Sequence, residues 1–469
     1  MKRVVLALLL LQLANGGCDR WQSREVSDPP KRAPVKDDAN RSVAEGGEYT
    51  QLFVPLTGVP PSEGCQLKDY SYASEVKCFA LSEGDLVKNL LIKDANPSDR
   101  IRLFPTTNVA EELLLSKERA TPIKSNQSGT GYRWFGNVYL GAQPEKKIGT
   151  ALLSLRNGRI IARITTENDV YEIKPLGNGV HAVIKADTSK SLPIHPDKYL
   201  DREKGGSYSA PVSTGKSDSW DWNWPELIKV ANAAPACPAQ PPINRSLVPT
   251  VRVALAFEKS AVKPFDEIVE LAAAFIDFTQ TAMENSRVSL NVALPVAEEA
   301  RLIENFVISD ESLNELTEGN HRSGGTIGSI HQWREKVRAD LVVIITKNVG
   351  YCGLSAQVKP DKRNFGFALV HPDCTNVQLQ VSHEIGHLLG GDHELNNARS
   401  DRSDSDARAH ILEGLNRKTI MYVNSSFPEP YFSNPDVCWD LDHPMGVAEV
   451  ANNARAMSAR ASVVSKFCR

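Results

Sequence analysis

Three histidines in a short segment have the spacing of ligands for one catalytic metal ion. The segment 375–393 reads TNVQLQVSHEIGHLLGGDH and contains His383, His387 and His393. Two histidines four positions apart lie on one face of a helix in adjacent turns, so both imidazoles can reach one cation. Gly390 allows a sharp turn after the helix, which can return His393 to the same cation. Three neutral imidazoles leave one position of a tetrahedral Zn²⁺ open for water, as in catalytic rather than structural sites.

Glu384 is the candidate general base. It follows a predicted ligand directly, so its carboxylate can accept a proton from zinc-bound water and later deliver that proton to a leaving amine. One catalytic Zn²⁺ would lower the pKa of the water from about 15.7 toward about 7. The fixed positions of HExxHxxGxxH are expected by chance on the order of 10⁻⁵ times in a chain of this composition, so the motif is specific. A helix with solvent-facing histidines and a zinc site without activity are the alternatives.

The metal motif lies on a predicted helix with a defined end. Thr375 and Gln378 have the spacing of a capping box, and Gly390 and Gly391 end the pattern. Apolar side chains recur at helical spacing, at Val377, Val381, Ile385 and Leu388. The sequence therefore predicts a helix that stops just before His393.

Strand and helix patterns alternate around this helix after residue 248. Apolar runs predict strands at 251–257, 289–294, 340–346 and 366–371, and helical spacing predicts helices at about 265–283 and 330–338. Such an alternation favours a largely parallel sheet covered by helices, in the α/β or α+β class.

The segment HEIGHLLGGDH resembles the extended zinc signature of the metzincin metalloproteases at every fixed position. Met421 in TIMYV looks like the Met-turn residue of that clan, an apolar support beneath the metal site. Further similarity is to the reprolysin-like branch, and most closely to bacterial peptidyl-Asp metalloendopeptidase-like proteins. This similarity covers about residues 248–469 and rests on ADLVVIIT (339–346), CGLS (352–355), Cys374 and YFSNP (431–435).

The resemblance implies a metzincin catalytic domain at 248–469. Such a domain has a mostly parallel, twisted five-stranded sheet with helices, an antiparallel edge strand at the cleft and a small irregular lower subdomain after His393. We expect 366–371 to be the edge strand, along which an extended peptide pairs by main-chain hydrogen bonds. The implied activity is a zinc-dependent endopeptidase that acts on protein or peptide substrates.

Two features near the motif receive no functional role. Tyr422 follows Met421 directly, not two places later as in the branches where a tyrosine joins the metal site, so we assign it no oxyanion role. The insert 396–410 is polar and acidic, and because its acidic spacing fits no EF-hand loop we expect a solvated loop. A Ca²⁺ site there is the unsupported alternative.

The region 48–200 has the pattern of a β-rich domain of hairpins. Alternating segments flank Asn157-Gly158, a strong two-residue turn signal, and further alternating segments flank 177–179. This region is similar to reprolysin-type propeptides, which implies a prodomain that inhibits the enzyme as part of a zymogen. His181 and His195 each stand alone, and we interpret them as surface or core residues. The stretch 201–247 has the composition of a linker.

The first 17 residues have the regions of a secretory signal peptide in the right order. Lys2 and Arg3 precede an apolar run at 4–11, and small residues precede Cys18. We expect a secreted or periplasmic protein, and a lipid anchor at Cys18 is the alternative. The polar stretch 18–47 is interpreted as a flexible spacer.

Eight cysteines fit an oxidising compartment. Their spacing suggests the local pairs Cys65–Cys78, Cys352–Cys374 and Cys438–Cys468. Cys237 could then supply a thiolate to the open zinc position of the precursor and act as a zymogen switch. A disulfide or an inert thiol at Cys237 is the competing interpretation.

The bulk composition points to no other kind of partner. Lys+Arg 54 against Asp+Glu 57 gives a formal charge of −3, too balanced to indicate a nucleic-acid partner. No segment after the leader is long and apolar enough for a transmembrane helix. Two other function classes stay open: a catalytically inactive zinc-binding adhesion or interaction module, and a non-peptidase zinc hydrolase.

Overall fold

The computed structural model describes residues 50–56, 64–82, 100–103, 112–124, 129–195, 198–199, 208–209, 243–264, 266–304, 308–318, 325–356, 358–397, 403–412, 414–423, 427–440 and 442–468. The predicted signal peptide, the spacer, most of the predicted linker, Cys18 and Cys237 lie outside these residues. Tyr49–Arg469 forms one compact unit. Within the described ranges, no helix has both the length and the apolar character needed to cross a bilayer.

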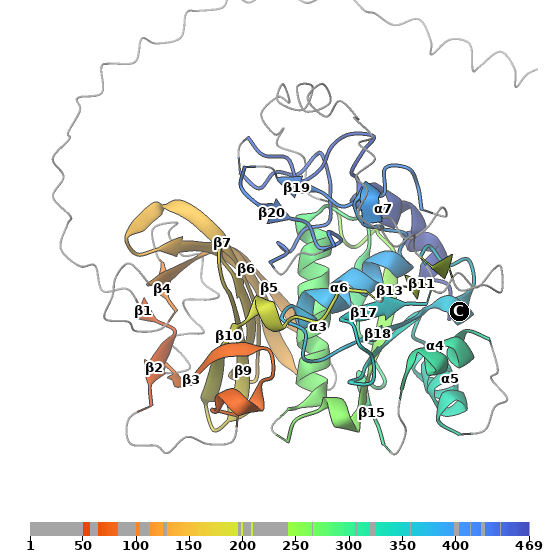
Figure 1. Ribbon diagram of the computed structural model, residues 1–469, viewed down its shortest axis with the longest axis horizontal. Helices are drawn as coiled ribbons and strands as arrows, with labels where there is room; N and C mark the ends of the chain where they lie inside the picture. Colours follow the sequence, from red (N-terminus) through yellow and green to blue (C-terminus); the bar gives the residue numbers. More distant parts are fainter. Residues whose placement is uncertain are drawn as a thin grey trace, which may run out of the picture. The chain divides into compact units, whose positions relative to one another are not determined.

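The N-terminal part of this unit is a ten-stranded sheet, as expected for a β-rich region (Figure 1). Its strand order is β1-β4-β5-β6-β7-β8-β9-β10-β3-β2, and β1 pairs with β4 in parallel, whereas the other neighbours are antiparallel. The strands are β1 Thr50–Gln51, β2 Phe53–Pro55, β3 Ala73–Leu81, β4 Ile101–Arg102, β5 Leu113–Lys124, β6 Thr130–Leu140, β7 Gln143–Arg156, β8 Arg159–Thr165, β9 Val170–Gly177 and β10 Val180–Ala186. A separate pair joins β11 Lys198–Tyr199 to β12 Tyr208–Ser209.

The predicted two-residue turn at Asn157-Gly158 is present in this sheet, and a second Asn-Gly turn lies within the predicted connection 177–179. Asn157 and Gly158, between β7 and β8, have φ of 50° and 74°. Asn178 and Gly179, between β9 and β10, have φ of 51° and 75°. Positive φ at both central positions is the geometry that matches the twist of antiparallel strands and that Asn-Gly adopts at low cost. The local sequence therefore fixes these two turns.

His181 is buried in the N-terminal sheet, and its ring must be neutral there. Its Nε2 accepts a hydrogen bond from the Ile160 backbone N–H at 3.1 Å, and its Nδ1 lies 3.2 Å from the Gly179 carbonyl oxygen. Burial lowers the pKa of His181 to about 4. The interpretation of His181 as a core residue agrees with these contacts.

We expect His181 to make the protein sensitive to acid. The pKa is lower in the folded chain than the ordinary 6.5, so unfolding takes up a proton as the pH falls. The contribution is fully present above pH 6.5 and is lost between pH 6.5 and about 4, up to roughly 3 kcal/mol. Urea unfolding of the wild type and of His181→Gln across this range measures the effect. His443→Gln, which replaces a partly exposed histidine, is the reference and should lose as much unfolding free energy in acid as the wild type. If His181→Gln also loses as much unfolding free energy as the wild type, His181 is not the group responsible.

The C-terminal part contains a second sheet of six strands in the order β14-β13-β16-β18-β17, with β15 also paired to β13. Pairing is parallel except between β17 and β18, so the sheet is largely parallel as predicted, but it has six strands where five were expected. The strands are β13 Thr250–Glu258, β14 Asn291–Ala293, β15 Ala300–Ile303, β16 Leu341–Ile345, β17 Gly353–Ser355 and β18 Phe367–Val370. The helices are α3 Ile268–Asn285, α4 Asp310–Thr317, α5 Thr326–Val337, α6 Val377–Leu388 and α7 Asn453–Val464. A short pair, β19 Ile411–Leu412 and β20 Arg417–Lys418, follows α6.

The prediction that 366–371 forms the edge strand is wrong. β18 lies between β16 and β17, and the short antiparallel strand β17 occupies the edge. All four residues of β18 are buried, as expected for a strand with a neighbour on each side. β17 is only three residues long, too short to produce a periodic signal in the sequence.

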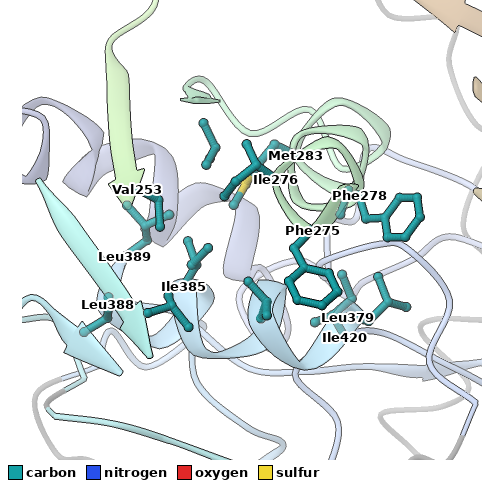
Figure 2. Close-up of a cluster of buried hydrophobic side chains, with 14 of the residues drawn as sticks. Val253, Phe275, Ile276, Phe278, Met283, Leu379, Ile385, Leu388, Leu389 and Ile420 are labelled. Carbon is teal, nitrogen blue, oxygen red and sulfur yellow. The ribbon is translucent and has the colours of Figure 1, made fainter. Parts of the chain in front are cut away.

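The core of the C-terminal part lies between its sheet, α3 and α6. Figure 2 shows Phe275 and Ile276 of α3 on the side that faces Leu379 and Ile385 of α6, close to Val253 of β13. The Thr279 and Ser382 hydroxyls of the two helices also lie 2.8 Å apart. The metal motif is therefore on a helix that is buried along its whole length.

The N-terminal sheet has an apolar core of its own, and a few side chains of its β6, β7 and β8 also belong to the core around α3. Phe135, Leu152 and Ile161 of β6, β7 and β8 belong to the same buried apolar cluster as α3. On the same face, Arg156 and Asp277 form a buried ion pair with Nη2 3.0 Å from Oδ2, and Ser154 donates to that carboxylate at 2.6 Å. Burial raises the pKa of Asp277, whereas Arg156 opposes the shift. The stability of the two parts is therefore coupled through α3.

Candidate metal centre

The three motif histidines converge on one point. His383 and His387 extend from α6, and the chain turns at Gly390, which has φ of 92°, to bring back His393. The Nε2 atom of His393 lies 3.1 Å from that of His383 and 3.0 Å from that of His387. All three rings are buried. The structure thus brings together the three residues that the spacing predicted as ligands.

A fourth histidine, His195, completes the cluster. Its Nε2 lies 3.0 Å from His383 Nε2 and 2.8 Å from His393 Nε2. The ligand atoms of the four rings all lie within 4.8 Å of one another. Sequence reasoning missed His195 because it is separated from the motif by almost 190 positions and has no local spacing partner. Its arrival at the site depends on the fold.

Each of the four rings is oriented by a backbone carbonyl group. The Nδ1 atoms of His383, His387 and His393 lie 2.8 to 2.9 Å from the carbonyl oxygens of Ile420, Gly391 and Asn397. His195 Nδ1 lies 2.8 Å from the Gly353 carbonyl oxygen. A hydrogen bond of this kind places the ring hydrogen on Nδ1 and leaves Nε2 as the ligand atom.

This donor set fits a divalent cation such as Zn²⁺. With hydrogens on Nδ1, the Nε2 lone pairs face one another at 2.8 to 3.1 Å, which is repulsive unless a cation lies between them. Imidazole nitrogens about 2.0–2.1 Å from zinc in a tetrahedron are about 3.3–3.4 Å apart, a few tenths of an ångström more than the observed spacing. Neutral imidazole is a preferred ligand of zinc and of other late transition metals. The residues present can therefore hold such an ion.

Glu384 lies beside the cluster and is fully buried. Its Oε1 accepts a hydrogen bond from Gln380 Nε2 at 2.8 Å and lies 3.9 Å from His195 Nδ1. The backbone at Gly353 passes so close that a Cβ atom there would overlap Glu384 Oε1 and approach Gln380 Nε2 to 2.8 Å. The position of this carboxylate therefore depends on a glycine in the edge strand.

We expect Gly353→Ala to lower peptidase activity about 10²-fold, because the added methyl group displaces the Glu384 carboxylate by a fraction of an ångström or more. Gly350→Ala, three residues earlier in the chain, is the matched control, since a Cβ atom at Gly350 meets nothing within 4 Å. The measurement is kcat/KM of the processed protein, with the bound zinc counted in each sample. Equal activities for the two variants at equal zinc content count against the proposed contact.

Met421 lies beneath the motif helix. A Cβ atom at Gly386 would come within 2.6 Å of Met421 Sδ and 2.9 Å of Phe432 Cε1, so only glycine lets α6 approach this closely. The residue before Met421, Ile420, supplies the carbonyl oxygen that orients His383. This segment therefore supports the ligands through backbone and apolar contacts.

The predicted capping box at the start of the motif helix is wrong. The helix begins at Val377 with Asn376 as the N-cap, and no side chain caps it. The Thr375 hydroxyl donates to Ser191 Oγ at 3.2 Å, and the Thr375 carbonyl oxygen accepts from Arg163 Nη1 at 3.2 Å. Thr375 is used for tertiary contacts with the N-terminal region, which the local spacing could not indicate.

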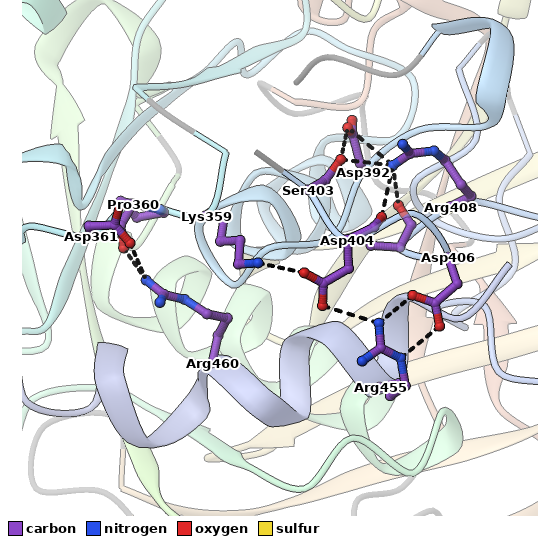
Figure 3. Close-up of polar contacts among 11 residues, drawn as sticks. Lys359, Pro360, Asp361, Asp392, Ser403, Asp404, Asp406, Arg408, Arg455 and Arg460 are labelled. Atoms are coloured by element: carbon purple, nitrogen blue, oxygen red, sulfur yellow. Dashed lines mark hydrogen bonds and ion pairs between the residues drawn. The ribbon is translucent and has the colours of Figure 1, made fainter. Parts of the chain in front are cut away.

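The acidic residues of the insert that the structure describes are paired with basic side chains (Figure 3). Asp404 Oδ1 lies 2.5 Å from Lys359 Nζ, and Arg455 pairs with both Asp404 and Asp406. Asp392, next to the ligand His393, accepts from Ser403 Oγ at 2.8 Å. Because these carboxylates are paired with basic side chains, residues 403–410 present no cluster of carboxylates for Ca²⁺. The contact between Ser403 and Asp392 also holds the turn that carries His393.

Two of the three predicted disulfides are present, Cys65–Cys78 and Cys352–Cys374. The predicted pair Cys438–Cys468 is wrong, because Cys438 is disulfide-bonded whereas Cys468 is a free thiol. The Cys468 backbone N–H donates to Asp340 Oδ1 at 3.3 Å beside β16, where the chain arrives after the twelve residues of α7. Closeness in sequence therefore did not place the two sulfurs together. Cys237, the predicted switch residue, lies outside the described residues.

Comparison with known proteins agrees with the site. Residues 270–394, which include the three motif histidines, match the family described as metallo-peptidase family M12B, reprolysin-like. Over these residues the chain is similar to reprolysin-like metallopeptidases. It is also 27% identical over 333 residues to a peptidyl-Asp metalloendopeptidase of Stenotrophomonas maltophilia strain R551-3, which covers 68% of this chain and 71% of the relative. A relative of the same name from Xanthomonas campestris pv. campestris is 26% identical over 352 residues, or 71% of this chain and 75% of the relative.

These matches confirm the predicted resemblance and the predicted enzyme class, a metalloendopeptidase. Among solved structures, the crystal structure of metalloproteinase-II from Bacteroides fragilis aligns with 81% of this chain and 96% of its own length. That alignment has 12% identity and a TM-score of 0.35, which is too low to assign a fold.

Proposed function

We propose that this protein is a secreted, zinc-dependent endopeptidase made as a zymogen, in which His383, His387 and His393 hold the metal and Glu384 is the general base. The observation that carries the proposal is the convergence of three Nε2 atoms beside a buried carboxylate. A bound zinc ion would supply Lewis acidity, which activates water near neutral pH and polarises the scissile carbonyl group.

The protein residues supply orientation and proton transfer. Carbonyl groups fix the three imidazoles, so the ligands do not reorganise during turnover. Glu384 takes the proton of the attacking water and passes it to the leaving amine, and Gln380 holds one of its oxygens in place. The buried surroundings strengthen these charge interactions because little bulk water screens them.

The edge strand β17 is the proposed binding strand for substrate. It is the outermost strand of the sheet beside the metal site, and its Gly353 lies in contact with Glu384. An extended peptide that adds to this strand is held by its main chain, which suits an enzyme that cuts inside polypeptides. The names of the relatives suggest that an aspartate beside the scissile bond is the first specificity to test.

Secretion and zymogen synthesis rest on separate features. The leader at 1–17 and the two disulfides are typical of a protein that folds in an oxidising compartment. The segment 191–195 contacts β17, because the Cys352 and Gly353 backbone N–H groups donate to the Pro193 and Ile194 carbonyl oxygens at 2.8 and 3.0 Å. A chain segment on the proposed substrate strand supports an inhibited precursor.

Chelation tests the proposed function. The processed protein is incubated with casein, then with a chelator, and then with added Zn²⁺, and the fragments are sequenced by mass spectrometry. We expect internal cleavages that stop on chelation and return with zinc. A protein that binds zinc but leaves casein intact would be the adhesion or interaction module, and hydrolysis limited to small non-peptide substrates would identify the other hydrolase class.

A further inference from the structure

We propose that His195 is a fourth protein ligand of the metal, which converts the site from an open catalytic centre into a closed all-histidine centre. The inference builds on the proposed function, since it assigns the regulation of the same site. It concerns a residue that the motif does not contain and that enters from the N-terminal part of the chain.

The ring of His195 has the same arrangement as the three motif rings. Its Nδ1 faces the Gly353 carbonyl oxygen at 2.8 Å, which leaves Nε2 as the acceptor atom. That Nε2 is as close to His383 Nε2 and His393 Nε2 as those two atoms are to each other. A core histidine without a ligand role would direct Nε2 to a donor, as His181 does with the Ile160 N–H, and not toward other imidazole acceptors.

A fourth imidazole changes what the metal can do. Tetrahedral zinc with four protein ligands is the structural type, whereas catalytic zinc keeps one position for water or substrate. The His195 ring also lies against the general base, with Nδ1 3.9 Å from Glu384 Oε1. His195 would therefore occupy the metal position that the attacking water needs. That position is next to Glu384, the group that would remove the proton of this water.

The backbone before His195 blocks the substrate strand at the same time. Pro193 and Ile194 accept hydrogen bonds from the Cys352 and Gly353 N–H groups of the edge segment. Ser191 contacts Thr375 at the start of the motif helix. Withdrawal of the single segment 191–195 would therefore free the metal position and the peptide-binding strand together.

The N-terminal sheet gives this segment a fixed origin. β10 ends at Ala186, only nine residues before His195, and the same sheet is joined to α3 through the buried Arg156–Asp277 pair. The imidazole is thus supplied from within the chain at high effective concentration, which favours ligation over competing water. Activation requires removal of the 191–195 segment from the edge strand and the metal centre, and not separation of the whole sheet from α3.

Cobalt substitution of the full-length chain tests the ligand assignment without a catalytic readout. Intact protein is loaded with Co²⁺ and titrated with azide, a small ligand for open metal positions, while the visible absorption is followed. We expect no spectral response from the wild type or from His443→Ala, which replaces a partly exposed histidine outside the cluster. We expect His195→Ala to bind azide, and free imidazole to restore the unresponsive spectrum in that variant.

Zinc retention provides a second readout. With a chromogenic chelator, His195→Ala should release zinc about tenfold or more faster than the wild type, because a direct ligand has been lost. A wild-type cobalt protein that binds azide as readily as His195→Ala overturns the proposal, and the wild-type measurement holds even if the variant folds poorly. If the variant opens the metal position but does not cut casein, the ligand assignment stands and the proposed peptidase function fails.

Discussion

Replacement of Glu384 by Gln is expected to lower kcat about 10²–10⁴-fold while KM changes little. Glutamine keeps the size of the side chain and its contact with Gln380, but it cannot accept a proton from water. The loss therefore falls on the chemical step and not on substrate binding. The measurement is steady-state cleavage of a fluorogenic peptide by the processed protein at saturating and limiting substrate.

The zinc content of Glu384→Gln must equal that of the wild type for this result to be informative. Glu335→Gln, which removes a half-exposed carboxylate on α5, is the control for loss of charge alone. If Glu384→Gln retains more than about a tenth of the wild-type kcat with full zinc, proton transfer is carried by another group and the assigned base is wrong.

Removal of one member of the buried Arg156–Asp277 pair is expected to cost about 3–5 kcal/mol of unfolding free energy. Asp277→Leu leaves the buried Arg156 guanidinium without the carboxylate that it contacts. Arg156→Met leaves the buried Asp277 carboxylate without that guanidinium. The double variant places two apolar side chains together and is expected to recover most of the loss. Urea unfolding of the intact protein, followed by tryptophan fluorescence, gives the three values.

A second ion pair on the same helix is the matched control. Arg159 Nη1 lies 3.0 Å from Glu270 Oε2, and the arginine side chain is 38% exposed. Because this pair is screened by water, Arg159→Met should cost less than about 1 kcal/mol. If Arg156→Met and Arg159→Met lower the unfolding free energy by similar amounts, β7 and β8 are not coupled to α3 through the buried charge.

Local sequence patterns were enough to predict much of the site without knowledge of the tertiary structure. The spacing of His383 and His387 on a helix, the glycine turn and His393 are within eleven residues, so short-range geometry suffices to bring three imidazoles together. The two Asn-Gly hairpins are local for the same reason, since two residues with positive φ define each turn. The family resemblance followed from these short segments as well.

Tertiary structure alone decided the features that depend on distant partners. The edge strand is a three-residue segment whose role comes from pairing with β18, and Thr375 serves Arg163 and Ser191 instead of capping its helix. The approach of His195 to the motif likewise joins positions far apart in the sequence. No periodicity records such contacts, because each joins segments that only the folded chain brings together.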